Sequence, residues 1–192
     1  MTQDYYQQQA ESFFNNTFDV DMSPLYQQFL SSIPKGGHVV DAGCGSGRDS
    51  RYFSEQGFDV TAFDASSALV ELAKKHTGLP VLLSTFSEFS VSKPVDGIWA
   101  CASLLHVPFD ELTASFKHLA KSLKTDGVFY CSFKYGAGEV TREGRHFTNL
   151  NEELLAEVLQ GTGLTVDKHW QTGDQREGRD NERWLNAILV KH

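Results

Sequence analysis

The chain has 192 residues, of which 40% are hydrophobic, and its 25 acidic against 17 basic side chains give a formal net charge of −8. This length and composition predict one globular domain over residues 1–192, large enough to bury a core. The acidic balance argues against nucleic acid and anionic membranes as partners, because both attract basic proteins.

Three cysteines are present, Cys44, Cys101 and Cys131, and they follow no disulfide framework. An odd number without such spacing is typical of a reducing compartment, and no Cys and His spacing matches a metal site. Neither a signal peptide nor an apolar run of bilayer length is apparent. We therefore expect a cytoplasmic protein with no membrane partner and no metal, and the sequence carries no signal for its oligomeric state.

Helical and extended patterns alternate along the chain, which predicts a parallel sheet covered by helices on both faces. Residues 1–36 are expected to form an N-terminal helical lid segment, with a helix beginning at Ser23-Pro24. Later helices are expected from Arg48 to about Gly57, from Ser66 or Ser67 onward, over 112–123 and from Asn151 onward. Strands are predicted at 39–42, 60–63, 81–83, 97–100, 128–133, 164–170 and 184–190.

A glycine turn follows the first predicted strand, where residues 41–47 read Asp-Ala-Gly-Cys-Gly-Ser-Gly. Glycines let the backbone turn sharply and approach a ligand, and the amides of the next helix point at the same place. Dinucleotide sites use G-x-G-x-x-G around a pyrophosphate, whereas the spacing here is G-x-G-x-G behind an acid. A carboxylate repels a pyrophosphate and attracts an ammonium. Asp41 therefore favours S-adenosylmethionine, which ends in an amino acid, over NAD.

A second acid, Asp64, lies where the second predicted strand ends, and Ala65 follows it. About 20 residues beyond the glycine turn, an acid can accept hydrogen bonds from both hydroxyls of a ribose. Thr85 and Phe86 follow the third predicted strand. We expect Phe86 to pack on an adenine face, with a nearby hydroxyl or the backbone contacting the edge of the base.

These features make the chain resemble the class I S-adenosylmethionine-dependent methyltransferases. The resemblance implies an α/β fold: a single doubly wound Rossmann-like domain with a seven-stranded, mostly parallel sheet and an antiparallel last strand. Thr125 and Asp126 replace a proline and a glycine of a family turn, and the Gly47-Arg48 join looks most like the tellurite-resistance-type small-molecule branch. The residues that carry the resemblance are 41–47, Asp64, 96–106 and 123–129.

The resemblance implies transfer of a methyl group from S-adenosylmethionine to a small-molecule acceptor. Two other classes stay open: a non-catalytic module that binds this cofactor, and an NAD-binding oxidoreductase. The expected cofactor-binding residues are Asp41, Gly43, Cys44, Gly45, Gly47, Asp64, Ala65, Thr85, Phe86, Ala100 and Cys101.

His106 comes directly after the fourth predicted strand and is the candidate general base for an acceptor that arrives protonated. The alternative is a histidine that only lines the pocket. Tyr5 and Tyr6, in the N-terminal segment, are expected to close over the cofactor as part of a lid, and packing of this segment on the body is the alternative.

Arginines gather in two stretches that should leave the ligand-binding edge of the sheet, residues 134–149 and 171–183. These predicted substrate-side loops hold five of the seven arginines in the chain. Because a guanidinium grips an oxyanion with a planar fork, we expect Arg145, Arg176 and Arg179, with Arg142, to bind an anionic group of the acceptor. Acidic residues are interleaved with them, so ion pairs within the loops are the alternative.

Overall fold

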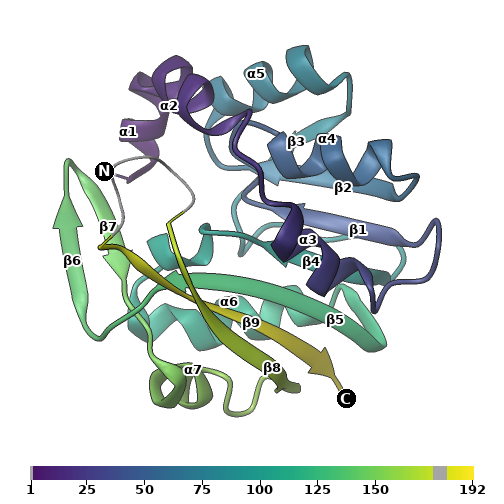
Figure 1. The fold of residues 1–192 in the computed structure, drawn as a ribbon, viewed down its shortest axis with the longest axis vertical. Helices are drawn as coiled ribbons and strands as arrows, with labels where there is room; N and C mark the ends of the chain where they lie inside the picture. Colours follow the sequence, from purple (N-terminus) through teal and green to yellow (C-terminus); the bar gives the residue numbers. More distant parts are fainter. Residues whose placement is uncertain (1, 175–180) are drawn as a thin grey trace.

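The computed structural model describes residues 2–174 and 181–192, and its centre is a seven-stranded sheet in the order β3-β2-β1-β4-β5-β9-β8 (Figure 1). The first five strands along the chain pair in parallel, and β9 runs antiparallel to both β5 and β8. The predicted doubly wound sheet with an antiparallel last strand is thereby confirmed. The strands are β1 His38–Ala42, β2 Asp59–Asp64, β3 Val81–Leu83, β4 Val95–Ala100, β5 Leu123–Lys134, β8 Leu164–Gly173 and β9 Arg183–Lys191.

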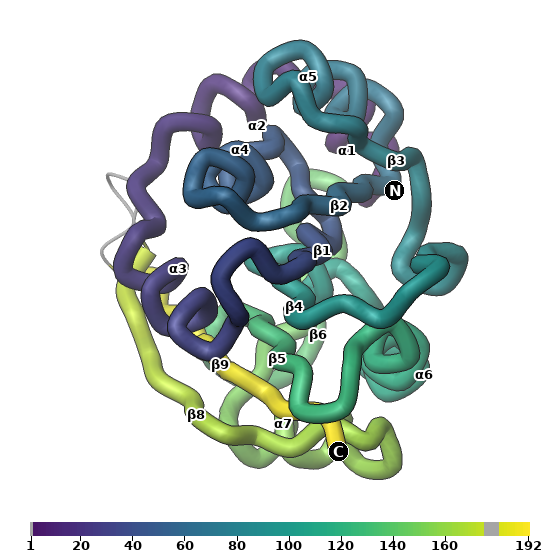
Figure 2. Tube along the Cα trace, turned by 90° about the vertical axis from the view of Figure 1, so that its right-hand side faces the viewer, coloured from purple at the N-terminus to yellow at the C-terminus, as the bar shows by residue number. Residues whose placement is uncertain are grey.

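Helices cover both faces of the sheet (Figure 2). On one face lie α3 Ser23–Leu30, α4 Arg48–Glu55 and α5 Ser67–Thr77, and on the other lie α6 Phe109–Ala120 and α7 Glu152–Val158. A single 3-10 turn, η1 Leu104–His106, follows β4. Two caps predicted from the sequence are confirmed, since the side chains of Ser66 and Asn151 accept hydrogen bonds from the backbone three residues later.

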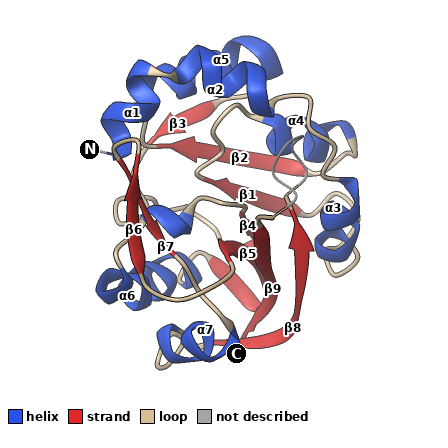
Figure 3. Cartoon of the chain, turned by 60° about the vertical axis from the view of Figure 1, so that its left-hand side comes forward, coloured by secondary structure: helices blue, strands red, loops and turns tan. Residues whose placement is uncertain are grey.

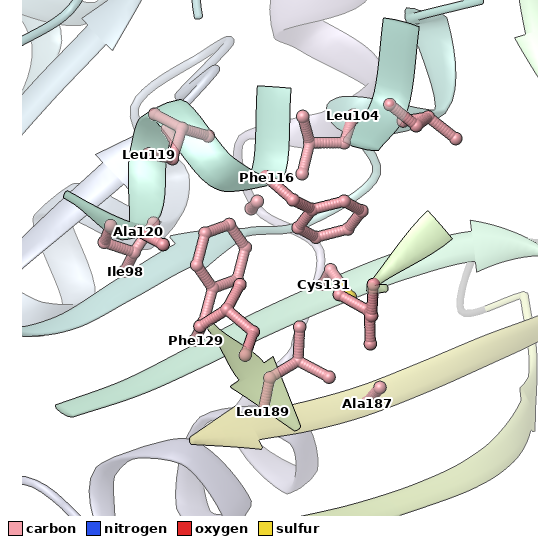
Figure 4. Close-up of a cluster of buried hydrophobic side chains, with 14 of the residues drawn as sticks. Ile98, Leu104, Phe116, Leu119, Ala120, Phe129, Cys131, Ala187 and Leu189 are labelled. Atoms are coloured by element: carbon pink, nitrogen blue, oxygen red, sulfur yellow. The ribbon is translucent and has the colours of Figure 1, made fainter. Parts of the chain in front are cut away.

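The core beneath α6 forms where the helical repeat of that segment meets alternating strand residues. Phe116 and Leu119 of α6 and Ile98 and Phe129 of the sheet are all fully buried in one cluster (Figure 4). On the opposite face Trp99 stacks on Tyr130, with ring centroids 3.9 Å apart. The two cores fix β4, and therefore place the residues that follow it at one edge of the sheet.

Two segments differ from the sequence-based expectation. Residues 134–149, expected as a loop, contain the hairpin β6 Glu139–Arg142 and β7 Arg145–Thr148, which lies beside α1 Thr2–Gln8 (Figure 3). The turn between the strands has only two residues, Glu143 and Gly144, both with positive φ, which matches the twist of paired strands. The expected loop 171–183 is also shorter, because β8 and β9 stay paired out to Gly173 and Arg183.

The N-terminal segment folds as two short helices before α3. They are α1 and α2 Ala10–Thr17, and both pack against α5. None of the helices among the described residues has the length and apolarity needed to cross a membrane.

Candidate functional site

A cavity of about 590 Å³ opens at the carboxyl ends of the parallel strands. Its walls come from α1 and α2, the glycine loop after β1, the ends of β2 and β5, the turn after β4, and the β6–β7 hairpin. Ligands of open parallel sheets bind at this edge, because the loops that leave it converge there. The cavity therefore brings together segments that are distant in the sequence.

The glycine loop is held in a conformation that side chains resist. Gly43, Gly45 and Gly47 have φ angles of 75°, 55° and 80°, in the left-handed region that favours glycine. The amides of Gly43 and Cys44 both donate to the carbonyl oxygen of Phe63, each at 2.9 Å. A Cβ on Gly43 would lie 2.6 Å from the Cβ of Ser103. Gly43 can therefore pack this closely against Ser103 only because it lacks a side chain.

Two acids flank this loop. Asp64 accepts hydrogen bonds from the amides of Gly45 and Ser66, each at 2.9 Å, and burial raises its pKa. Asp41 lies behind the loop and accepts a hydrogen bond from Ser50 Oγ at 2.6 Å. Burial, and then the charge of nearby Asp49, raise the pKa of Asp41 to about 8. Burial therefore disfavours the charged form of both acids, and a bound cation would favour it.

A buried ion pair begins α4, directly after the loop. Arg48 donates from Nε and Nη2 to the two oxygens of Asp49, at 2.6 and 3.1 Å. The same carboxylate accepts from the hydroxyl of Tyr26 at 2.5 Å and from Trp99 Nε1 at 2.7 Å. Burial alone would raise the pKa of Asp49, but the charge of Arg48 and these hydrogen bonds lower it. The network ties α3, α4 and β4 together beneath the cavity.

His106 faces the cavity from the turn after β4 and is hydrogen bonded at both ring nitrogens. Its Nδ1 lies 2.6 Å from the carbonyl oxygen of His146, and its Nε2 lies 2.8 Å from the hydroxyl of Tyr6. Burial lowers the pKa of His106 to about 4. The ring is therefore neutral at neutral pH, and its Nδ1 carries the proton because a carbonyl oxygen can only accept.

Two basic side chains at the same end of the cavity, Arg145 and Lys134, each have an acidic partner. Arg145 donates to Glu143 at 2.7 Å, and Lys134 donates to Glu182 at 2.7 Å. Arg145 also has a buried Nε that lacks a hydrogen-bond partner among the described residues. The aromatic ring of Phe147 lies under both cations, 5.3 Å from the Arg145 guanidinium and 5.2 Å from Lys134 Nζ.

Most of the residues expected at the site line this one cavity, but four do not. Asp41, Gly47 and Ala100 lie behind its wall, and the Tyr5 ring packs on the guanidinium of Arg145, 4.2 Å from its centre. Arg176 and Arg179 lie outside the described residues. The expected residues that line the cavity are Gly43, Cys44, Gly45, Asp64, Ala65, Thr85, Phe86, Cys101, His106, Arg142 and Arg145.

Several lining residues were not among the expected site residues. Trp184 of β9 lines the cavity with Lys134 at the end of β5. Phe13 reaches the cavity from α2, whose short polar sequence gives no strong helical stripe. Tyr6, which was expected with Tyr5 to close over the cofactor, lines the cavity from α1. The signal that could have identified Arg48 is a charged pair at the helix start that follows a glycine turn.

The residues present fit an adenosyl cofactor. The glycine loop forms a cradle that a Cβ would fill, Asp64 lies at the end of β2, and Phe86 lines the cavity beyond β3. A sheet of this order with a glycine loop after β1 defines an α/β protein of the methyltransferase type. A family model described as a methyltransferase domain matches residues 14–169, and the chain belongs to that family.

Relatives of the chain carry related names. It is 27% identical over 161 residues to an uncharacterized methyltransferase of Staphylococcus carnosus, covering 74% of this chain and 78% of that one. It is 28% identical over 120 residues to a ubiquinone biosynthesis O-methyltransferase of Xanthomonas axonopodis pv. citri, covering 58% of this chain and 49% of the relative. The chain thus spans about half the length of this second relative.

A solved structure shows the same fold. It is the 1,6-didemethyltoxoflavin-N1-methyltransferase of Burkholderia thailandensis, bound to 1,6-didemethyltoxoflavin and S-adenosylhomocysteine. The TM-score is 0.79 at 22% sequence identity, over 98% of this chain and 84% of that chain.

Proposed function

We propose that this chain transfers a methyl group from S-adenosylmethionine to a small-molecule acceptor. The observation that carries the proposal is that one cavity joins the glycine loop and Asp64 to the neutral ring of His106. When bound, S-adenosylmethionine supplies an electrophilic methyl group on a positively charged sulfur. The protein then has to bind, orient and desolvate the two partners, and remove a proton if the acceptor carries one.

The cofactor is proposed to lie along the glycine loop. Asp64 holds the ribose hydroxyls, and the loop residues Gly43 to Gly47 hold the methionine end, with Asp41 behind them attracting its ammonium group. Phe86 packs on the adenine. Ala65, Thr85, Ala100 and Cys101 complete the walls. Support comes from the left-handed glycines and from the raised pKa values of Asp41 and Asp64, since a cation near them offsets their burial.

His106 is proposed to be the base that takes up the proton released in the reaction. Its Nδ1 is fixed as a donor by the carbonyl of His146, so Nε2 is the nitrogen that can accept. Taking up a proton there puts a positive charge in the cavity as the sulfur loses one, so the total charge of the site is unchanged.

The acceptor is proposed to be a small ring compound with a weakly acidic O–H or N–H. The names of the relatives point this way, since one acts in ubiquinone biosynthesis and a structural neighbour binds 1,6-didemethyltoxoflavin. Phe147 and Trp184 offer apolar surface, and the unpartnered Nε of Arg145 can donate to a carbonyl or carboxylate oxygen of the acceptor. The compact chain and the Gly47-Arg48 join support the tellurite-resistance-type branch within the family.

Calorimetry tests the cofactor. We expect S-adenosylmethionine and S-adenosylhomocysteine to bind, Asp64→Ala to weaken both, and NAD not to bind. Asp19→Ala is the control, because Asp19 is 90% exposed. Binding of NAD alone, or of none of the three, would overturn the proposal.

Methyl turnover tests the reaction. The protein is incubated with S-adenosylmethionine labelled in the methyl group and with catechol, 4-hydroxybenzoate or theophylline, which offer a phenol, a phenol with a carboxylate, and a ring N–H. Labelled product from any of them supports the proposal. Cofactor binding without product from these or a wider set of acceptors would indicate a binding module. If Arg145 contacts an acceptor carboxylate, Arg145→Ala raises KM for 4-hydroxybenzoate and leaves that for catechol unchanged.

A further inference from the structure

The hydrogen bonds around His106 determine where an acceptor's proton can go. Because Nδ1 donates to the His146 carbonyl, the neutral ring has a single lone pair, on Nε2. That lone pair is already occupied, since the Tyr6 hydroxyl lies 2.8 Å away and must be the donor. An acceptor in the cavity therefore cannot reach His106 Nε2 while Tyr6 is in place.

Tyr6 is well held in this position. It is on α1, lines the cavity, and its ring makes edge contacts with Tyr5 and Phe13, with centroid separations of 5.4 and 5.0 Å. Its phenolic oxygen carries two lone pairs in addition to the proton it donates. One can accept a hydrogen bond from Arg145, which favours the ionised form of Tyr6 although burial raises its pKa overall. The other lone pair is available for a hydroxyl or N–H of the acceptor.

We propose that Tyr6 is the catalytic residue that contacts the acceptor and relays its proton to His106. This inference rests on the proposed function. As the acceptor oxygen forms its bond to the methyl carbon, its proton moves to Tyr6 Oη and the proton of Tyr6 moves to His106 Nε2. The acceptor keeps the electron pair of its O–H bond, the sulfur keeps the pair of the broken C–S bond, and His106 becomes an imidazolium. The imidazolium later loses its proton to solvent.

The relay makes the N-terminal helix part of the active site. Gln7 Oε1 accepts hydrogen bonds from Ser67 Oγ at 3.1 Å and from the amide of Ala68 at 3.2 Å. Thr2 Oγ1 accepts from the amide of His146 at 2.9 Å. These contacts seat α1 between α5 and the β6–β7 hairpin, and only the seated helix places Tyr6 against His106.

A cofactor-free experiment tests the arrangement. In nitrogen-15 NMR spectra at neutral pH, His106 is assigned by the signals that His106→Gln removes. We expect Tyr6→Phe to shift the Nε2 resonance, because that nitrogen loses its donor, and to leave Nδ1 protonated. Tyr135→Phe is the control, since it removes a tyrosine hydroxyl that bonds to Glu152 outside the cavity. An unchanged Nε2 resonance in Tyr6→Phe would overturn the relay.

Kinetics with catechol test the chemical role of Tyr6. If catechol is not methylated, whichever of 4-hydroxybenzoate and theophylline is methylated takes its place. Tyr6→Phe should lower kcat about 100-fold, in the range for general acid–base catalysis, with KM and cofactor affinity within about twofold. Adding His106→Gln should cost little more, since the two residues act as one unit. Solvent isotope measurements at several D₂O fractions should show two protons in transfer for the unaltered protein.

The outcomes separate the relay from the function on which it rests. If His106→Gln slows turnover and Tyr6→Phe does not, the relay is wrong and methyl transfer stands. If the isotope effect reports one proton, or if Tyr6→Phe changes only KM, Tyr6 does not carry the proton. If no acceptor is methylated by any variant, the proposed function fails and the relay fails with it.

Discussion

Replacing Gly43 with alanine should separate the two costs that shape the glycine loop. The φ of this residue is 75°, where a side chain costs about 1–2 kcal/mol. The new Cβ would also lie 2.6 Å from the Cβ of Ser103, so that residue must move. Ser103 Oγ donates to the Ala42 carbonyl at 2.7 Å, and a weakened hydrogen bond adds about 1 kcal/mol. The expected loss of stability is about 2–3 kcal/mol.

Gly78→Ala is the matched control, because Gly78 has a φ of 70° and a Cβ there would meet nothing within 4 Å. It should lose only the backbone term, about 1–2 kcal/mol. Urea unfolding followed by circular dichroism gives both values, and equal slopes would show that the same surface is exposed. Calorimetry should also find weaker S-adenosylmethionine binding in Gly43→Ala alone. Equal losses of stability in the two variants would refute the argument that the loop is clamped against Ser103.

Three further predictions follow from the buried charges. Asp49→Asn leaves Arg48 without its counter-charge and should lower the free energy of unfolding in urea by about 3 kcal/mol. Asp19→Asn, on the surface, should not change it measurably. Similar losses in the two variants would show that the pair beneath the cavity contributes no more than a surface charge. Because Asp41 has a pKa of about 8, it is largely protonated at pH 7, and binding of a cofactor ammonium should make it release up to about one proton. Calorimetry in buffers of different ionisation enthalpy measures this proton release. If Asp41→Asn still releases the proton on binding, another group is its source. The pKa of His106 is about 4 in the folded protein and about 6.5 in the unfolded chain. Its neutral ring therefore contributes about 3 kcal/mol to the free energy of unfolding above pH 6.5, and this contribution is lost as the pH falls towards 4. If the stability of His106→Gln depends on pH in the same way over this range, another group titrates.

The sheet could be predicted from the sequence because its strands are apolar and bounded by clear turns. Strand β3 matches its predicted limits, β1 begins one residue earlier than predicted, and β2 is one residue longer at each end. The stripe of α6 and the caps of α5 and α7 follow from the same local rules. That the glycine turn and the second acid meet at one edge of the sheet was also predictable, since both are local patterns with fixed places in a parallel sheet.

The β6–β7 hairpin was not predicted, because its local signals are weak. Its strands are only four residues long. β6 is mostly exposed, whereas β7 runs from two half-buried residues to two buried ones, so neither strand shows a clear alternation of buried and exposed positions. Its turn uses Glu143-Gly144 in place of the Asn-Gly or Asp-Gly pair that usually marks such a hairpin. The partner of His106 was equally hidden. Tyr6 is 100 residues away, on a helix with no buried residue to orient it.

The charges around the glycine loop explain why a cationic cofactor suits it better than a dinucleotide. Arg48 is committed to Asp49 by two hydrogen bonds, and although its charge also lowers the pKa of Asp41, that pKa stays raised. Asp41 and Asp64 lie on either side of the loop, and burial raises the pKa of both. A pyrophosphate at the loop would add negative charge to this pair and raise those pKa values further, whereas an ammonium and a sulfonium would lower them. The loop can therefore select the cofactor by charge before any side chain contacts the base.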